Sequence, residues 1–289
     1  MTAEHRDTPG IDHTSGEFIG VGGTTIYYQE WSSAEDPVRA VVLIVHGIAE
    51  HSGRYEALAA DLVRAGFAVG ALDHRGHGRS GGKRVQVARF DDLVDDLATF
   101  ADLMRERYPS PMPMFVLGHS MGGLVSLRYL IRDRPEVAGL VLSGAAAAKP
   151  EDISGFTIAV GNLLAKVAPD VGVASLQLDK ISRDPQVVID YNHDPLVTKA
   201  KVRARMGSQV LWAMEVTEQA LPTLTVPILI MHGGDDVVTP PDGSRMIAEK
   251  VGSTDKTLKI YDGLWHEIYN EPERDAVVSD VIAWLNREM

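Results

Sequence analysis

A short apolar run that ends in a serine between two glycines constrains the fold of this chain more than any other segment. Residues Met114–Gly123 read MFVLGHSMGG, which predicts a buried strand, and the residues that follow, to about Ile131, suit a helix. A serine on so sharp a turn has a strained backbone and an exposed hydroxyl, and a Cβ at Gly118 or Gly122 would collide with the surrounding strand and helix. The pattern predicts Ser120 as a nucleophile, although a plain glycine-rich turn fits the same spacing.

A base for this serine, and a partner for the base, follow later in the chain. Residues Val226–His232 predict a parallel strand that ends at a turn containing Asp235 and Asp236. Residues Thr257–Tyr261 predict the next strand, and His266 lies in the loop after it. The order Ser, Asp, His, each after a strand, is the order found in α/β-hydrolases. Spacing alone leaves both aspartates open as the acid.

Two backbone N–H groups can be assigned to an oxyanion hole. The amide of Met121 directly follows the serine, at the start of a helix whose dipole favours negative charge. The predicted strand Ala40–Val45 leads into a second loop, in which Gly47 lets the backbone turn. We therefore expect the Ile48 amide to face the Ser120 hydroxyl.

With these residues in place, the sequence resembles the monoacylglycerol lipases within the serine α/β-hydrolase superfamily. The most specific segments are His46–Tyr55, Asp73–Ser80, Gly118–Gly123 and Tyr191–Leu196. The resemblance extends from about Phe18 to the C-terminus and is nearest to the bacterial branch, including the actinobacterial enzymes. It implies an α/β-hydrolase fold without a cofactor, and a catalytic triad of Ser120, Asp236 and His266.

The resemblance also implies which residues contact the substrate. Glu50, Arg54 and Tyr191 match positions at the glycerol end, whereas a surface ion pair is the alternative for Glu50 and Arg54. His119 flanks the serine and either contacts substrate or fills the turn. The expected reaction hydrolyses monoacylglycerol to fatty acid and glycerol through an acyl-enzyme. A broader carboxylesterase or lysophospholipase, and more remotely a non-catalytic ligand-binding relative, are the alternatives.

The order of predicted elements divides the chain. Strands alternate with helices up to residue 145 and again from residue 226, which predicts a mostly parallel sheet covered on both faces. Between these parts lie apolar helical stretches, at Phe156–Val167 and Val202–Val216. We expect a flexible tail (1–16), a core (17–145 and 226–289) and an inserted helical cap (146–225). The apolar side chains of the cap predict the wall of an acyl-chain tunnel, unless they pack on the main sheet.

Composition limits the partners and the location. The net charge of −12 argues against a nucleic-acid partner and against charge-driven adhesion to anionic lipid, which leaves transient cap–lipid contact as the membrane interaction to consider. The sequence has no cysteine, no signal peptide pattern and no membrane-spanning run. We expect a cytoplasmic protein or one bound peripherally to a membrane or envelope, of undetermined oligomeric state. His74 and His77 with Asp73 lack further ligands for a metal, so none is predicted.

Overall fold

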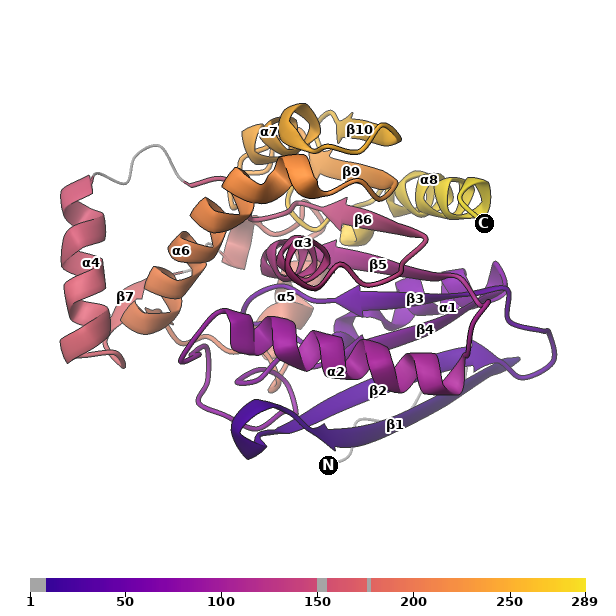
Figure 1. Cartoon of the computed structure of the whole chain (residues 1–289), viewed down its shortest axis with the longest axis horizontal. Coiled ribbons are helices and arrows are strands. Elements are labelled where there is room, and N and C mark those ends of the chain that lie inside the picture. Colours follow the sequence, from indigo (N-terminus) through magenta and orange to yellow (C-terminus); the bar gives the residue numbers. More distant parts are fainter. Residues whose placement is uncertain (1–8, 150–154, 176–177) are drawn as a thin grey trace.

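Eight strands form one sheet in the order β1-β2-β4-β3-β5-β6-β9-β10 (Figure 1). The computed structural model describes residues 9–149, 155–175 and 178–289. The strands are β1 (Ile11–Ile19), β2 (Thr25–Ser33), β3 (Ala40–Val45), β4 (Phe67–Leu72), β5 (Met114–His119), β6 (Gly139–Ser143), β9 (Ile228–Gly233) and β10 (Lys256–Tyr261). The pairs β1–β2 and β2–β4 are antiparallel, and the remaining pairs are parallel. The predicted mostly parallel sheet is confirmed.

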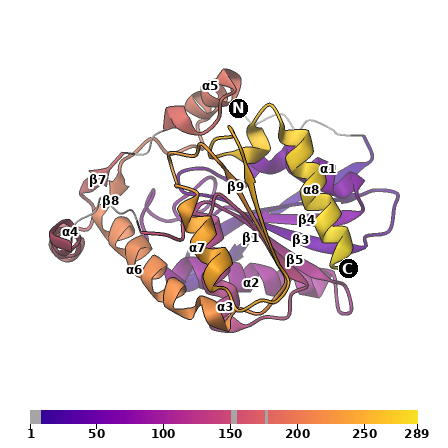
Figure 2. The ribbon, with the colours of Figure 1, turned by 90° about the horizontal axis from the view of Figure 1, so that it is seen from above.

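The central strands are apolar along their whole length because both faces of the sheet are covered. In β3, for example, Val41 and Leu43 belong to one hydrophobic core, and Val42 and Ile44 belong to the other. The first core contains α2 (Asp91–Arg107), α3 (Met121–Asp133) and α7 (Asp242–Lys250), and the second contains α1 (Glu56–Arg64) and α8 (Arg274–Arg287) (Figure 2). Short 3-10 helices are η1 (Val21–Gly23), η2 (Ser52–Tyr55), η3 (Leu178–Lys180), η4 (Leu221–Thr223) and η5 (Ile268–Asn270).

The predicted flexible tail of residues 1–16 is too long. Strand β1 begins at Ile11 and pairs with β2 along its whole length. His13 lies opposite Trp31 in this register, and their rings stack with centroids 4.9 Å apart. Polar residues can form this strand because it lies at the edge of the sheet, where the partner strand supplies the hydrogen bonds and much of the side-chain surface faces water.

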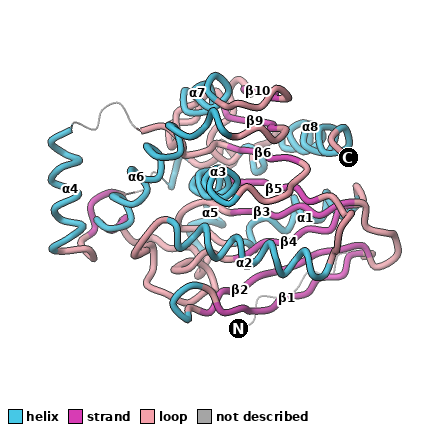
Figure 3. The backbone as a smooth tube through the Cα atoms, in the orientation of Figure 1, coloured by secondary structure: helices cyan, strands magenta, loops and turns pink. Residues whose placement is uncertain are grey.

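Within the segment predicted as a cap, the helix of residues 155–167 lies away from the sheet (Figure 3). It contains α4 (Gly155–Val167), β7 (Gly172–Ala174), α5 (Pro185–His193), β8 (Val202–Arg203) and α6 (Ala204–Ala220), and β7 pairs with β8. Within the described chain, no helix has both the length and the apolarity needed to cross a bilayer.

Some apolar side chains of this segment are buried in the protein core, and others are exposed on the surface. Met206 and Met214 of α6 are buried in the core that also contains α3, which is the packing alternative to a tunnel wall. Leu163 and Val167 of α4 are instead 60% and 69% exposed. The side chains of the first part of α4, Phe156 and Ile158 among them, lie outside the described set. A helical repeat identifies an apolar face but does not identify what covers it.

Candidate active site

Ser120 lies on the turn between β5 and α3 with a positive φ of 51°, a strained conformation for a residue with a side chain. The flanking glycines explain how the chain accommodates it. A Cβ on Gly118 would lie 2.6 Å from the Ser126 Oγ, and a Cβ on Gly122 would lie 2.0 Å from the carbonyl oxygen of Val45. Both glycines therefore allow β5, α3 and β3 to approach closely around the serine.

Gly122→Ala should destabilise the fold by about 3 kcal/mol, because the added methyl would meet backbone atoms of β3 that cannot rotate away. The measurement is the free energy of unfolding in urea. Gly161→Ala in α4 is the matched control, since a Cβ there has no heavy atom within 4 Å. That variant should be neutral or gain up to about 1 kcal/mol from helix propensity. Similar losses in both variants would contradict the close-contact explanation.

Asp236 and His266 are brought together by the loops after β9 and β10. The Asp236 Oδ2 accepts a hydrogen bond from the His266 Nδ1 at 2.7 Å, and both side chains are buried. The Oδ1 of Asp236 accepts the backbone amides of Val238 and Thr239 at 2.8 and 3.0 Å. Asp235, the other aspartate of the turn, is exposed. The structure thus places Asp236, and not its neighbour, beside the histidine.

Asp236 and His266 each stabilise the charged form of the other residue. Burial raises the pKa of Asp236, but the His266 charge and the hydrogen bonds donated to the carboxylate outweigh burial and hold its pKa well below the ordinary value. Burial lowers the pKa of His266, and Asp236, followed by Glu267 and Glu50, raises it above the ordinary value of an imidazole. The carboxylate is therefore ionised and stabilises a positive charge on His266.

Two further side chains contact Asp236, and the sequence analysis did not identify them. The His232 Nε2 lies 3.0 Å from Oδ2 of Asp236 and 2.6 Å from the Thr239 carbonyl oxygen, so this nitrogen carries the proton. The Thr239 hydroxyl lies 2.9 Å from the same Oδ2. The signal for His232 was its position at the end of β9, four residues before the acid. These contacts fix the orientation of the carboxylate.

The loop after β3 is positioned by Glu50. The Oε1 of Glu50 accepts the Gly47 amide at 2.6 Å and the Tyr55 hydroxyl at 2.8 Å. A Cβ on Gly47 would lie 3.1 Å from the Ser120 Cβ, so the loop runs directly beside the candidate nucleophile. Met121 is the first residue of α3, where a helix leaves its N–H groups without intrahelical partners. The expected positions of both oxyanion donors are therefore adjacent to Ser120.

The three residues predicted at the glycerol end form one charged cluster with an additional acid. The Arg54 Nη1 donates to Glu50 at 2.8 Å and to Glu267 at 2.6 Å, and its Nη2 donates to Glu267 at 2.7 Å. The Tyr191 ring covers the guanidinium, with the Arg54 Cζ 4.4 Å from the ring centroid. All of these side chains are largely buried, so the alternative of a surface ion pair does not apply. Glu267 was not identified from sequence, although it directly follows His266.

A small cavity joins this cluster to the candidate triad. Its lining includes Ser120, His266, Glu50, Glu267, Tyr191 and Ile48. His119 also lines it, with its Nδ1 3.1 Å from the Ser143 carbonyl oxygen and its ring centroid 4.7 Å from that of His266. Burial, with the neighbouring His266, lowers the pKa of His119 to about 3, so this ring is neutral. One pocket therefore contains a candidate nucleophile, a base and a polar wall.

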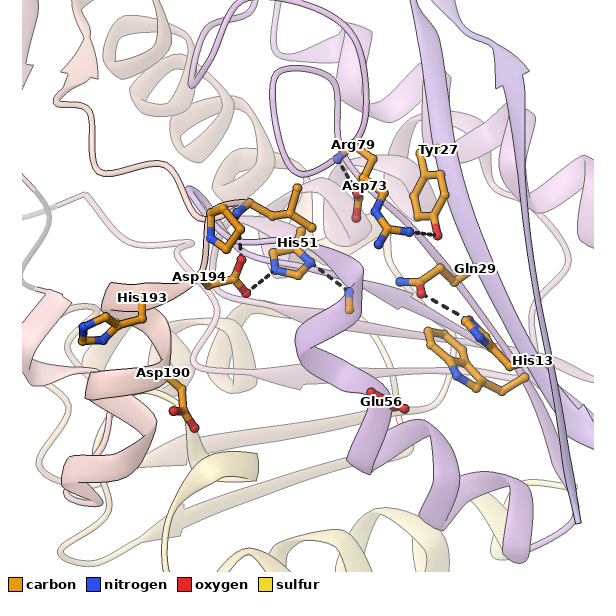
Figure 4. A pocket seen from close by; sticks show the side chains of 14 residues that line it. His13, Tyr27, Gln29, His51, Glu56, Asp73, Arg79, Asp190, His193 and Asp194 are labelled. Atoms are coloured by element: carbon orange, nitrogen blue, oxygen red, sulfur yellow. Dashed lines mark hydrogen bonds and ion pairs between the residues drawn. The ribbon is translucent and has the colours of Figure 1, made fainter. Parts of the chain in front are cut away.

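A second cavity, of about 460 Å³, contains none of the candidate triad residues (Figure 4). The His51 Nε2 and the Asp194 Oδ2 form a hydrogen bond of 2.8 Å in its lining. His51 precedes η2 and Asp194 follows α5, so this hydrogen bond links the core to the segment predicted as a cap. Asp73, which precedes His74 and also lines this cavity, accepts the Ser52 amide and hydroxyl at 2.7 and 2.6 Å.

Comparisons with known proteins identify the family to which this chain is similar. The family described as serine aminopeptidase, S33, matches residues 36–273. The chain is 42% identical over 268 residues to a monoacylglycerol lipase of Mycolicibacterium smegmatis, covering 93% of this chain and 95% of that protein. It is 34% identical over 286 residues to the monoglyceride lipase of Homo sapiens, covering 98% and 91%. The solved structure of Paleococcus ferrophilus monoacylglycerol lipase matches with a TM-score of 0.80 at 32% identity, covering 91% of this chain and 99% of that one.

Proposed function

This chain belongs to the monoacylglycerol lipase family of serine ester hydrolases, and we propose that it cleaves monoacylglycerol to a fatty acid and glycerol. The observation that carries the proposal is the polar cluster of Glu50, Arg54 and Tyr191, of which Glu50 and Tyr191 line the same cavity as Ser120. A glycerol headgroup has two free hydroxyls that need partners once water is excluded. A cavity with a polar wall beside the candidate nucleophile suits such a leaving group.

The proposed reaction proceeds by acyl transfer. The substrate carbonyl oxygen lies between the amides of Ile48 and Met121, and His266 takes the proton of Ser120 as the hydroxyl attacks. Asp236 fixes the tautomer of His266 and stabilises its positive charge. His266 then donates that proton to the departing glycerol oxygen. In the second half, water activated by His266 attacks the acyl-enzyme and releases the fatty acid.

The same geometry favours monoacylglycerol over triacylglycerol. A triacylglycerol would displace water from the polar wall without offering hydroxyls to it, and each polar atom that loses a hydrogen-bond partner in this way costs about 1 to 3 kcal/mol. It would also need space for two more acyl chains in a small cavity whose lining includes Ile181, Tyr191 and Val238. The lost hydrogen bonds and the lack of space both disfavour triacylglycerol. We therefore assign a substrate with a single acyl chain.

A substrate panel with one variant tests this proposal. Tyr191→Phe removes a hydroxyl from the wall of the cavity and keeps the ring over Arg54. We expect wild type to hydrolyse monoacylglycerol rapidly and triacylglycerol slowly. The variant should lose about fivefold in kcat/KM on monoacylglycerol, the size of one hydrogen bond, with little change on a short p-nitrophenyl ester. Tyr261→Phe, whose hydroxyl contacts Asp280 at 2.7 Å, is the control. Equal losses on both substrates would remove the headgroup assignment.

We also propose that residues 146–225 form a cap that makes transient contact with a lipid surface. Several large apolar side chains of this segment are exposed, namely Val160, Leu163, Val167, Val171 and Val173. Where such side chains form one continuous patch, they are typical of a surface that meets a partner. Such contact would place the enzyme at a membrane or lipid droplet from which single-chain esters reach the site, consistent with a peripheral location.

A further inference from the structure

We propose that Glu267 sets the charge preference of the site, so that esters with a neutral polyol headgroup are accepted and those whose glycerol carries a phosphate are rejected. This inference rests on the proposed function, because it concerns which alcohol the enzyme releases. Glu267 directly follows the candidate base and lines the same cavity as Ser120. Its carboxylate is therefore placed where the headgroup of the substrate would lie.

The hydrogen bonds of Arg54 explain why this arginine does not act as a phosphate site. An arginine beside a glycerol headgroup would ordinarily bind phosphate through its paired N–H groups. Here the two terminal nitrogens donate to both oxygens of Glu267, and one of them also donates to Glu50. Tyr191 covers one face of the guanidinium. Binding a phosphate would require Arg54 to break its paired contact with Glu267.

The net charge of the cluster is negative. Glu50 and Glu267 contribute two carboxylates around the single guanidinium of Arg54, which leaves one negative charge. The exposed fractions of these side chains are 4%, 6% and 11%, so water screens the charge weakly. A dianionic phosphate in the cavity would meet this charge at short range, whereas a hydroxyl group could donate a hydrogen bond to a carboxylate oxygen.

The neighbouring titratable groups do not reverse the negative charge of the cluster. His119 is neutral because burial lowers its pKa to about 3. Burial, reinforced by the nearby carboxylates, raises the pKa of both Tyr55 and Tyr191, which remain uncharged hydroxyls. The His266 charge develops during the reaction and is paired with Asp236 at 2.7 Å. Asn270 donates to the Oε2 of Glu267 at 2.8 Å and adds no charge. Removal of either acid would neutralise the cluster, and Glu267 is the one that does not also hold the Gly47 amide of the loop after β3.

The experiment compares two esters with the same acyl chain in neutral detergent micelles, 1-oleoylglycerol and 1-oleoylglycerol 3-phosphate. Wild type should strongly prefer the neutral ester. Glu267→Gln should reduce this preference in kcat/KM by about tenfold or more, because it removes one weakly screened charge without changing side-chain size. Asp275→Asn removes the same formal charge from a side chain that is 94% exposed and should change the preference by less than about twofold. That control separates the local effect from repulsion by the acidic chain as a whole.

A third variant separates charge from geometry. Glu267→Asp keeps the charge but shortens the side chain, so it should keep the preference for the neutral ester even where overall activity falls. Loss of the preference in Glu267→Asp as well as in Glu267→Gln would overturn the proposal in favour of a packing role. An unchanged preference in Glu267→Gln would also overturn it, as would a wild type that cleaves both esters equally. Failure of wild type to release oleate from 1-oleoylglycerol would instead contradict the proposed function.

Discussion

Ser120→Ala should remove almost all ester hydrolysis, with a loss in kcat of about 10⁴- to 10⁶-fold, while the protein remains folded. The Ser120 hydroxyl is the protein group that forms a covalent bond to the acyl carbon in the proposed reaction. Alanine keeps the Cβ that already occupies the strained backbone at φ 51°, so the turn between β5 and α3 gains no new contact. The measurement is hydrolysis of a short p-nitrophenyl ester and of a monoacylglycerol, with circular dichroism and urea unfolding to verify the fold.

A fluorophosphonate probe gives an independent measurement of the same residue. Wild type should become labelled, with the modified peptide containing Ser120, and Ser120→Ala should not. Ser208→Ala is the matched control, since Ser208 lies on α6 and its hydroxyl contacts Asn162 at 2.6 Å. This variant should retain both labelling and activity. Retention of more than a few per cent of activity by Ser120→Ala, or labelling at another serine, would remove the nucleophile assignment.

The parallel part of the sheet could be predicted from sequence because its signals are local. Strand β3 occurs at the predicted residues, Ala40–Val45, and β5 begins at Met114, where the predicted run begins. Each is a continuous apolar run, the pattern required when helices cover both faces of a sheet. The turn at Ser120 could also be predicted from a local signal, because the two glycines and the serine lie within five consecutive positions. These features depend on neighbouring residues and not on distant parts of the chain.

The arrangement around the headgroup could not be predicted because it depends on contacts between distant segments. Glu267 and Arg54 are 213 residues apart in the chain, yet they form the paired contact at the centre of the cluster. The resemblance assigned Glu50 to the substrate, whereas the structure also shows its carboxylate bound to the Gly47 amide and to Arg54. Which donors a carboxylate meets is decided by packing, and a single sequence does not reveal it.

The segment predicted as a cap shows the same limit for apolar residues. The apolar stretch Val202–Val216 favoured the wall of an acyl-chain tunnel, with packing on the main sheet as the alternative. Met206 and Met214 of this stretch are buried in the core that contains α3. Among the described residues of the segment, Ile181 and Tyr191 line the Ser120 cavity. Amphipathic spacing thus indicates burial and leaves the covering partner undetermined.

Asp236→Asn should lower kcat by about 10⁴-fold, whereas Asp235→Asn should stay within about twofold of wild type. Asp236 accepts the Nδ1–H of His266 at 2.7 Å, which leaves the other ring nitrogen free to take the serine proton. An asparagine can turn its amide N–H₂ toward that ring, which favours the wrong tautomer, and it has no charge to stabilise the imidazolium. Asp235 is exposed, and its backbone amide, which donates to the Leu264 carbonyl at 3.0 Å, is unchanged by the substitution.

The pH profile of the residual activity distinguishes an electrostatic role of Asp236 from a purely structural one. Burial lowers the pKa of His266, and the Asp236 carboxylate is the largest factor that raises it above its ordinary value. A base works only when deprotonated, so wild-type kcat/KM should fall as the pH drops through this raised pKa. In Asp236→Asn the raising charge is absent and burial remains, so the acid limb should move to lower pH. An unshifted limb together with a lower unfolding free energy would indicate that Asp236 only supports the turn after β9, and a larger loss in Asp235→Asn would reverse the assignment of the two acids.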